Sequence, residues 1–359
     1  MTTTTCASGA HPPILRPVRS SDADALWNLL APAADELIGL SSLPHDAAGA
    51  ATACADSGAT LADLAAGSFL VEEGGARRLL FLVEQPAEGG PEVLGVTGVT
   101  FKHRYPNLAV EVATSADGLG LVMASSSVPW TRTELDSTFL GASARGRGLG
   151  TVVSRGRFPF LHLVGSQIPA TVASHLRGRF DPDGSAPFWR CFGADLAPWP
   201  TSTEAETALA HDPALLDTLA GHRRPLTAEV LESLGPVNAA SLPAFHLLGL
   251  EGLTPNGMYD PIDGGPTLVA DLADTVSGRH RIHGRATIGD PGPTDALVSV
   301  AGIDRFRVTR AAITVEPGQL QIDRATALAL RIDDDALLTA VPVGAGSGPA
   351  GQIAAATGP

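Results

Sequence analysis

The sequence predicts an α+β protein, because helical and strand patterns both occur and are unevenly distributed along the chain. A strand and a helix open it, short strand patterns separated by Gly/Pro turns follow, and another strand-rich segment lies near the end. With 359 residues, 44% hydrophobic and 17% charged, the composition is that of a globular chain. This length allows two domains or one large one, each with a core.

The first half is expected to begin with a short strand and a helix and to continue as an antiparallel meander. Leu26, Leu29 and Leu30 recur on one helical face, while Asp22 and Asp24 lie in the first turn, where the helix dipole favours carboxylates. A weaker, alanine-rich helix is expected at 47–66. The expected strands are 14–18, 68–73, 77–85, 92–103 and 131–143.

The second half is expected to be less regular. A helix at 151–163 and a strand at 168–176 precede a Gly/Pro-rich loop with a short amphipathic end. Helices are expected at 226–235 and 242–253, the second stopped by Gly252. From Asp295 onward the alternation predicts a small β-unit.

The charge balance excludes some functions. There are 38 acidic against 24 basic side chains, a net charge of −14, which argues against non-specific nucleic-acid binding and is compatible with a cationic small substrate. No stretch is long and apolar enough to be expected to span a membrane. The three cysteines are scattered, which predicts reduced thiols in a cytoplasmic protein. We expect no metal and no prosthetic group, because His162, His175 and His246 are isolated.

The run "RGRGLG", residues 145–150, lies between an expected strand and an expected helix. Glycines let a ligand approach the backbone, and a helix N-terminus behind them favours an anion such as a pyrophosphate. The alternative is a glycine-rich turn with solvated arginines, and the six residues alone do not decide between the two. The run is not a dinucleotide-binding fingerprint, because no βαβ unit opens the chain.

In its context this loop resembles the coenzyme A loop of the GNAT acyltransferase superfamily, whose usual opening is similar to "ILRPVRSSDADAL". Several further motifs are similar, in order and spacing, to those of bacterial arginine N-succinyltransferases. They are "RPVRSSDADALWNLL", "GLSSLP", "ELDSTFL", "RGRGLGTVVSRGRFPFL", "LRGRFDPDGSAPFW", "PAFHLLGLEG" and "YDPIDGGPTL". The chain is therefore identified as a divergent member of that family.

This resemblance implies tandem GNAT-like halves, with mixed, mostly antiparallel sheets flanked by helices, and a small C-terminal β-segment. The implied N-terminal half, at 13–195, carries the coenzyme loop. The second half is implied at 196–290 and the β-segment at 291–343. We expect a disordered leader at 1–12 and a disordered tail at 344–359.

The resemblance also implies an activity, the transfer of a succinyl group from succinyl-CoA to the α-amino group of arginine or a related amine, in arginine catabolism. Its partners would be an acyl-CoA and a cationic amino acid or other amine, with no nucleic acid and no membrane. A homo-oligomer or a hetero-oligomer with a related chain is possible. The implied coenzyme-binding residues are Thr138, Arg145, Gly146, Arg147, Gly148 and Gly150.

The chain departs from the family pattern where the acceptor and the proton donor are implied. Asn238 stands where the family has its proposed proton-donating histidine, and Asn cannot transfer a proton near neutral pH. His175 replaces a family Glu and is a weak candidate for proton transfer, while Phe245 replaces a family Arg. Two readings stay open: a divergent arginine or amine succinyltransferase, and a coenzyme-A-binding protein with another acceptor or a catalytically impaired partner subunit.

Overall fold

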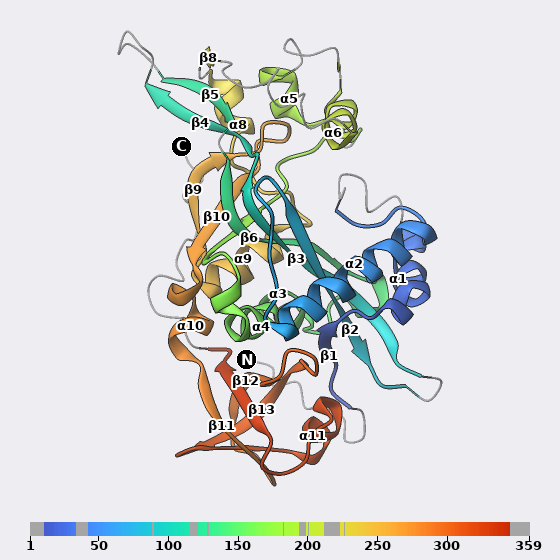
Figure 1. The fold of residues 1–359 in the computed structure, drawn as a ribbon. Coiled ribbons are helices and arrows are strands. Elements are labelled where there is room, and N and C mark those ends of the chain that lie inside the picture. Colours follow the sequence, from blue (N-terminus) through green and yellow to red (C-terminus); the bar gives the residue numbers. More distant parts are fainter. Residues whose placement is uncertain are drawn as a thin grey trace.

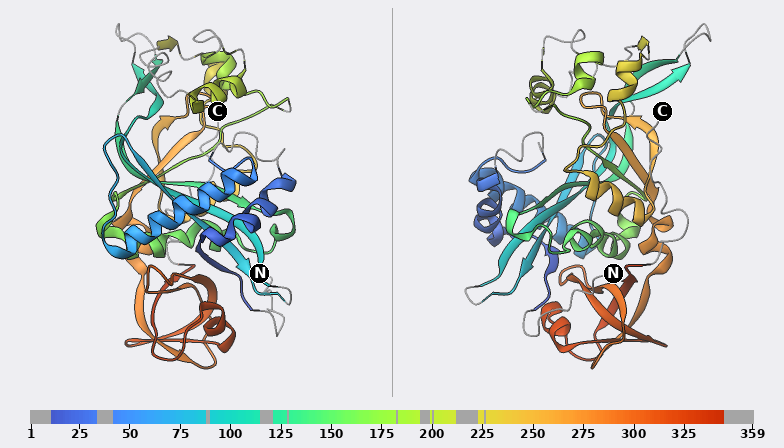
Figure 2. Two further views of the ribbon diagram at one scale, coloured as in Figure 1. Left: turned by 45° about the vertical axis from the view of Figure 1, so that its right-hand side comes forward. Right: turned by 180° about the vertical axis from the view of Figure 1, so that it is seen from behind.

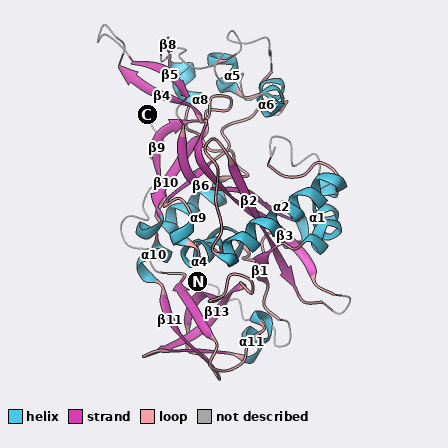
Figure 3. Cartoon of the chain, in the orientation of Figure 1, coloured by secondary structure: helices cyan, strands magenta, loops and turns pink. Residues whose placement is uncertain are grey.

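A computed structural model describes residues 11–33, 42–87, 90–114, 121–127, 129–181, 183–193, 199, 201–211, 223–225 and 227–344. It confirms the α+β class: a long, sheet-dominated body is flanked by helices, with a compact β-rich unit at one end (Figures 1 and 3). Most of the expected leader and tail, residues 1–10 and 345–359, lies outside the described residues.

The body is built on one twisted sheet whose strands do not follow chain order. Every neighbouring pair is antiparallel except β6 and β7. Across the sheet the strands are β1 (Ile14–Pro17), β2 (Ala76–Gln85), β3 (Glu92–Tyr105), β6 (Trp130–Leu140), β7 (Thr171–His175), β10 (Pro266–Asp271), β9 (Thr254–Tyr259), β4 (Leu108–Thr114), β5 (Leu121–Ser127) and β8 (Arg223–Pro225).

Helices cover both faces of the β1–β3 part of this sheet (Figure 2). Side chains alternate along β2, so that Leu80 and Leu82 pack against α1 and α2, whereas Leu79 and Phe81 share a core with α3 and α4. The helices are α1 (Ala23–Leu30), α2 (Ala47–Ala66), α3 (Gly150–Arg155), α4 (Arg157–Leu163), α5 (Pro187–Phe192), α6 (Ser202–His211), α8 (Ala228–Ser233), α9 (Leu242–Glu251), α10 (Val276–His280) and α11 (Arg324–Leu330).

The C-terminal strands close into a small barrel. Each of the five pairs with two others in the ring β12–β15–β11–β14–β13–β12, and β13 also pairs with β1 of the body. The strands are β11 (Ile282–Ile288), β12 (Thr294–Val300), β13 (Val308–Glu316), β14 (Gln319–Ile322) and β15 (Leu337–Pro342). The ring therefore includes β11, which precedes the residue 291 at which we expected the β-segment to begin.

Two expected elements are wrong. Residues 68–73 form no strand: they follow the end of α2 at Gly67 and pair with no described strand before β2 begins at Ala76. The expected helix at 151–163 is two helices that meet at Gly156. Pro159 causes the break, since it has no N–H to bond the carbonyl of Arg155 and its ring would collide with that carbonyl in a continuous helix.

Candidate active site

A β-bulge interrupts the central strand β6. Gly98 of β3 faces Asp136 and Val96 faces Phe139, so Ser137 and Thr138 together oppose a single residue, Thr97. Ser137 has a φ of 55°, a left-handed conformation that a non-glycine residue rarely adopts and that is often found at functional sites. The hydroxyl of Thr138 lies 2.8 Å from that of Thr97. The bulge, residues 136–138, thus turns a short length of backbone out of the regular ladder.

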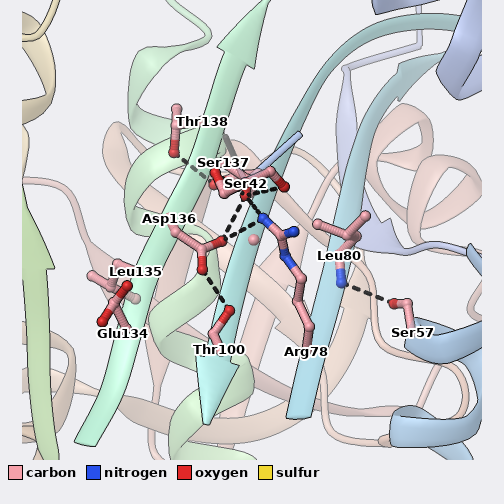
Figure 4. A network of polar contacts seen from close by, with 12 residues as sticks. Ser42, Ser57, Arg78, Leu80, Thr100, Glu134, Leu135, Asp136, Ser137 and Thr138 are labelled. Atoms are coloured by element: carbon pink, nitrogen blue, oxygen red, sulfur yellow. Dashed lines mark hydrogen bonds and ion pairs between the residues drawn. The ribbon is translucent and has the colours of Figure 1, made fainter. Parts of the chain in front are cut away.

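Polar side chains from three elements hold the bulge in place (Figure 4). The carboxylate of Asp136 accepts hydrogen bonds from Thr100 Oγ1 at 2.5 Å and from Arg78 Nη2 at 3.2 Å. Arg78 also donates to Ser137 Oγ, which lies 3.1 Å from Ser42 Oγ. Ser42 follows α1 and precedes α2, so this network ties that connection to the bulge.

A buried arginine supports the bulge through backbone carbonyls. The Arg157 side chain donates from Nη1 to the carbonyls of Gly98 at 3.0 Å and Asp136 at 3.5 Å, and from Nε to that of Ser154 at 3.0 Å. Burial lowers the pKa of this guanidinium to about 10, which still leaves it charged near neutral pH. Arg157 therefore fixes both strands at the bulge from the α4 side.

Strands β6 and β7 separate just beyond a short parallel pairing. Their paired residues are Thr133 with Val172 and Glu134 with Ala173, although β6 continues to Leu140. Ser174 Oγ donates to the carbonyl of Leu135 at 3.2 Å, at the point where the strands part. Beyond that point, no described strand pairs with the β7-facing side of β6. On this side, β6 beyond the pairing has no strand partner among the described residues, and an extended ligand could take that place.

The predicted glycine loop, Arg145–Gly150, connects the end of β6 to α3. Gly146 and Gly148 have φ values of 75° and 77°, and an added Cβ at either would meet only open space. Among the described residues, nothing accepts a hydrogen bond from the N–H of Gly146, Gly148 or Leu149. Adjacent free N–H groups at the start of a helix suit a phosphate. Residues 145–148 of the loop are exposed, and its geometry fits the anion-binding interpretation.

The two loop arginines also make contacts within the chain. Arg145 donates from Nε to the carbonyl of Leu140 at 3.0 Å, and its guanidinium lies over the ring of Phe139. Arg147 donates to Gln85 Oε1. These contacts hold the loop against the ends of β2 and β6. A groove of about 500 Å³, which α1 and the start of β3 also line, borders this region.

A charged cluster lies at the start of the gap between β6 and β7. Glu134, whose side chain is 13% exposed, accepts from Lys102 Nζ at 2.9 Å and from Arg132 Nε at 2.8 Å. Burial tends to raise the pKa of Glu134, but the positive charges of His175, Lys102 and Arg132 hold it well below its ordinary value. The carboxylate is therefore ionised and already engaged by two cations.

His175, the weak candidate for proton transfer, belongs to this cluster. Its Nδ1 lies 2.9 Å from Thr267 Oγ1, and its Nε2 lies 3.4 Å from Glu134 Oε2. Nε2 is buried and has no hydrogen-bond partner within the described part of the chain. The ring edge of His175 faces Trp130, with ring centroids 6.5 Å apart. A histidine ring whose Nε2 faces the carboxylate of Glu134 thus lies on the second strand of the gap.

Asn238 lies in the turn that leads into α9. Its Oδ1 accepts from the N–H of Ala240 at 2.9 Å, and its own N–H donates to the carbonyl of Arg177, just beyond β7, at 2.8 Å. The backbone carbonyl of Asn238 accepts from Ser241 and Leu242. The side-chain oxygen therefore has a structural task, the stabilisation of this turn.

Comparison with known proteins identifies the family. The model of the family described as "Arginine N-succinyltransferase beta subunit" matches residues 13–277, which is most of the chain. The chain belongs to the arginine N-succinyltransferase beta subunit family. The family predicted from the sequence motifs is thereby confirmed.

Relatives of this arginine N-succinyltransferase family member are distant. The arginine N-succinyltransferase subunit beta of Pseudomonas aeruginosa is 29% identical over 226 residues, 59% of this chain and 64% of that protein. The arginine N-succinyltransferase of Salmonella arizonae is 28% identical over 187 residues, 50% of this chain and 54% of that protein. The matched part of the chain thus spans less than two thirds of the length of either relative.

A solved structure has the same fold as this family member. The arginine/ornithine succinyltransferase subunit AI from Pseudomonas aeruginosa superposes with a TM-score of 0.76, covering 93% of this chain and 99% of that chain. Their sequences are 22% identical. The likeness extends past the family match, because the covered share includes most of the C-terminal barrel.

The structure brings most of the expected positions to one region. Thr138 and the glycine loop follow one another at the end of β6, His175 ends β7, and Asn238 bonds the chain just after β7. Sequence reasoning missed Glu134, Asp136 and the residues that hold them. A possible signal was the polar run "DST" inside an otherwise alternating strand, which is typical of a bulge.

Two absences concern only the described residues. Among the residues with assigned positions, no three His, Cys, Asp or Glu side chains are grouped to hold a metal ion. None of the helices in the described ranges combines the length and apolar character needed to cross a membrane.

Proposed function

We propose that the chain is an acyl-CoA-dependent N-acyltransferase that moves a succinyl group from succinyl-CoA to the α-amino group of arginine or a related amine. The observation that carries this proposal is the exposed glycine loop, with its free N–H groups, directly after a bulged strand that separates from its parallel neighbour. An acyl-CoA needs a phosphate site and, a short distance away, backbone groups along which its extended arm can lie.

Each part of the substrate has a counterpart in this arrangement. Gly146, Gly148 and Gly150 would let the backbone N–H groups reach the pyrophosphate, while Arg145 and Arg147 add positive charge at the same loop. The pantetheine arm would lie between β6 and β7, with the thioester near the bulge at Thr138. The open space beside Gly146 and Gly148 supports the placement of the pyrophosphate at this loop.

The reaction needs no nucleophilic side chain. The neutral amine attacks the thioester carbonyl, a C–N bond forms, the C–S bond breaks, and the thiolate leaves as the nitrogen loses its proton. A preorganised backbone N–H near the bulge would stabilise the oxyanion. His175 is the candidate to move the proton, because it ends the second strand of the gap and its Nε2 lies 3.4 Å from the ionised Glu134, which can orient the ring.

The proposal is tested by measuring thiol release from succinyl-CoA in the presence of arginine, ornithine, lysine and agmatine. We expect turnover with arginine or a close relative, and a lower rate with agmatine, which keeps the primary amine but lacks the α-carboxylate. Replacing succinyl-CoA with acetyl-CoA shows how far the acyl chain is recognised. Release that does not depend on any amine would contradict the proposal.

A second candidate function is favoured by Asn238. Its side-chain oxygen is committed to the turn before α9, and an amide cannot take over the proton transfer expected of the family histidine. The chain would then bind coenzyme A but use another acceptor, or act as a catalytically impaired subunit beside a related chain. Saturable coenzyme A binding without turnover for any amine, and full activity only after mixing with a related chain, would favour this candidate.

The proposed location is the cytoplasm, where succinyl-CoA and amino acids are both available. The proposed reaction uses succinyl-CoA as a co-substrate and requires neither a metal nor a prosthetic group. Activity that survives dialysis against a chelator would agree with this, and its loss would contradict it.

A further inference from the structure

A second pocket, of about 280 Å³, lies between the body and the C-terminal barrel, away from the gap and the glycine loop. Residues of β1, the segment before β13 and the end of α11 line it, over an apolar floor that includes Phe306 and Leu330. We call it the arginine pocket because five of its lining residues are arginines: Arg16, Arg19, Arg305, Arg307 and Arg331.

The charges around this pocket do not balance. Among the residues that line the pocket, Asp304 carries the one carboxylate. Asp22 and Glu84, which do not line it, both bind Arg16 at 2.7 Å and 2.6 Å. Five guanidinium groups thus face three carboxylates. Within the described residues, Arg305 and Arg331 form no ion pair. A local excess of positive charge is unexpected in a chain whose net charge is −14.

Arg307 is the most constrained of the five. It is 6% exposed, and its nearest carboxylate oxygen, on Glu84, is 3.7 Å away, beyond hydrogen-bond distance. Its side chain donates no hydrogen bond to any described residue, so its nitrogens reach solvent through the pocket. Burial and the positive charge of Arg331 lower the pKa of Arg307 to about 10. A buried cation of this kind is stabilised by an anion bound in front of it.

The backbone conformation of Arg331 is a second observation that points to a ligand in this pocket. It caps the C-terminus of α11 with a φ of 57°, a left-handed conformation in which glycine is the usual residue. An arginine costs about 1 kcal/mol more than glycine in this conformation. Its side chain nevertheless lines the pocket and adds a charge beside Arg307.

We propose that the arginine pocket binds a small organic or inorganic anion with two or more carboxylate or phosphate groups. The volume suits a ligand smaller than a nucleotide. The rim arginines, Arg305 and Arg331, would each hold one anionic group with paired N–H donors, while Arg307 binds the ligand from below. The ligand would touch both the body and the barrel, and so stabilise their contact.

The experiment is calorimetric titration of the full chain with citrate, pyrophosphate, phosphate and acetate at constant ionic strength. We expect one citrate site per chain, and citrate or pyrophosphate should bind in this pocket at least tenfold more tightly than acetate. Citrate against pyrophosphate tells carboxylate from phosphate preference. The double variant Arg305→Gln/Arg331→Asn should weaken binding at least tenfold, because it removes both rim charges. The variant should still fold, since Asn tolerates the left-handed conformation and both side chains are exposed.

Two controls locate the effect. Arg324→Gln removes an exposed arginine from α11 that does not line the pocket, and it should leave the affinity unchanged. Gly148→Asp alters the glycine loop and should leave the citrate affinity of the arginine pocket unchanged, which separates this site from any binding of anions at the loop. The proposal is overturned if none of the four anions binds saturably, or if the double variant binds as tightly as the unaltered chain.

Discussion

Arg157 Nη1 donates to the carbonyl oxygen of Gly98 at 3.0 Å, so a buried charge holds the strand opposite the bulge without a carboxylate in direct contact. The guanidinium instead satisfies three backbone carbonyls, those of Gly98, Asp136 and Ser154. Carbonyls at a bulge have lost regular ladder partners, and a planar group with several donors can replace them. The hydrogen bonds of Arg157 thereby fix α4 to the bulge.

Arg157→Met is expected to lower the free energy of unfolding by about 2 kcal/mol, because it leaves buried carbonyls without donors. Chemical denaturation measures this, and coenzyme A titration of the folded variant should show weaker binding through the displaced bulge. The matched control is Arg310→Gln, which removes an exposed ion pair with Asp295 and should cost less than about 1 kcal/mol. Equal effects of the two changes would contradict the role given to Arg157.

Gly148→Asp is expected to reduce coenzyme A affinity at least tenfold, since a carboxylate would face the phosphates. Gly148→Asn is the control, because Asn has nearly the same shape and also tolerates a φ of 77°. Calorimetric titration with coenzyme A measures both. If the two variants bind equally well, or if the affinity of Gly148→Asp stays within about threefold, under about 0.7 kcal/mol, the loop does not bind the pyrophosphate.

Glu134→Gln should lower stability at pH 7 by about 3 kcal/mol, because it leaves partly buried cations without their carboxylate. The pKa of Glu134 is depressed in the folded chain, so its contribution is fully present above the ordinary value of about 4.3 and is lost as the pH falls through the folded-state pKa. The difference between variant and unaltered chain should therefore be constant from pH 7 to about pH 4.3 and shrink progressively below that pH.

Denaturation midpoints from pH 7 down to pH 3 measure this difference. Glu92→Gln, at an exposed position that begins β3, is the control and should change stability little at any pH. A Glu134→Gln deficit that stays constant down to pH 3 would mean that the lost contact is not electrostatic.

Asn238→His is expected not to raise the rate of succinyl transfer. The substitution removes the Oδ1 acceptor for Ala240 N–H and should cost about 1 kcal/mol of stability. Asn238→Asp keeps an acceptor and should be nearly neutral. Thiol release measured from pH 5.5 to 8.5 checks the rate. A gain of tenfold or more, with a new limb near pH 6.5, would show that the family reaction can be restored.

Local signals predicted most of the fold. The alanine-rich helix at 47–66 has the expected bounds, because Asp46 caps its start and Gly67 ends it. The helix break at Gly156 was missed, since the apolar pattern continues across it and a proline early in a helix is normally tolerated. Helix α11 was missed as well. Its seven residues lie in a strand-rich context, and only Asp323, which bonds Thr326, marks its start.

Candidate residues that are adjacent in the sequence could be named in advance, whereas those that only the fold brings together were missed. The glycine loop is six consecutive residues whose context suggested an anion site. Glu134 and Lys102 lie 32 positions apart and come together only through the pairing of β3 with β6. The closure of the C-terminal strands into a barrel could not be predicted either. It requires the parallel pairing of β11 with β14, which are not joined by a hairpin turn.

The pairing of β1 with β13 has a consequence for synthesis of the chain. Thr309 Oγ1 donates to the carbonyl of Pro13 at 2.7 Å, which joins residues 296 positions apart. As the polypeptide leaves the ribosome, β1 can add β2 early, but its other edge has no partner until β13 emerges. That edge stays open to wrong partners until residues 308–316 have been made.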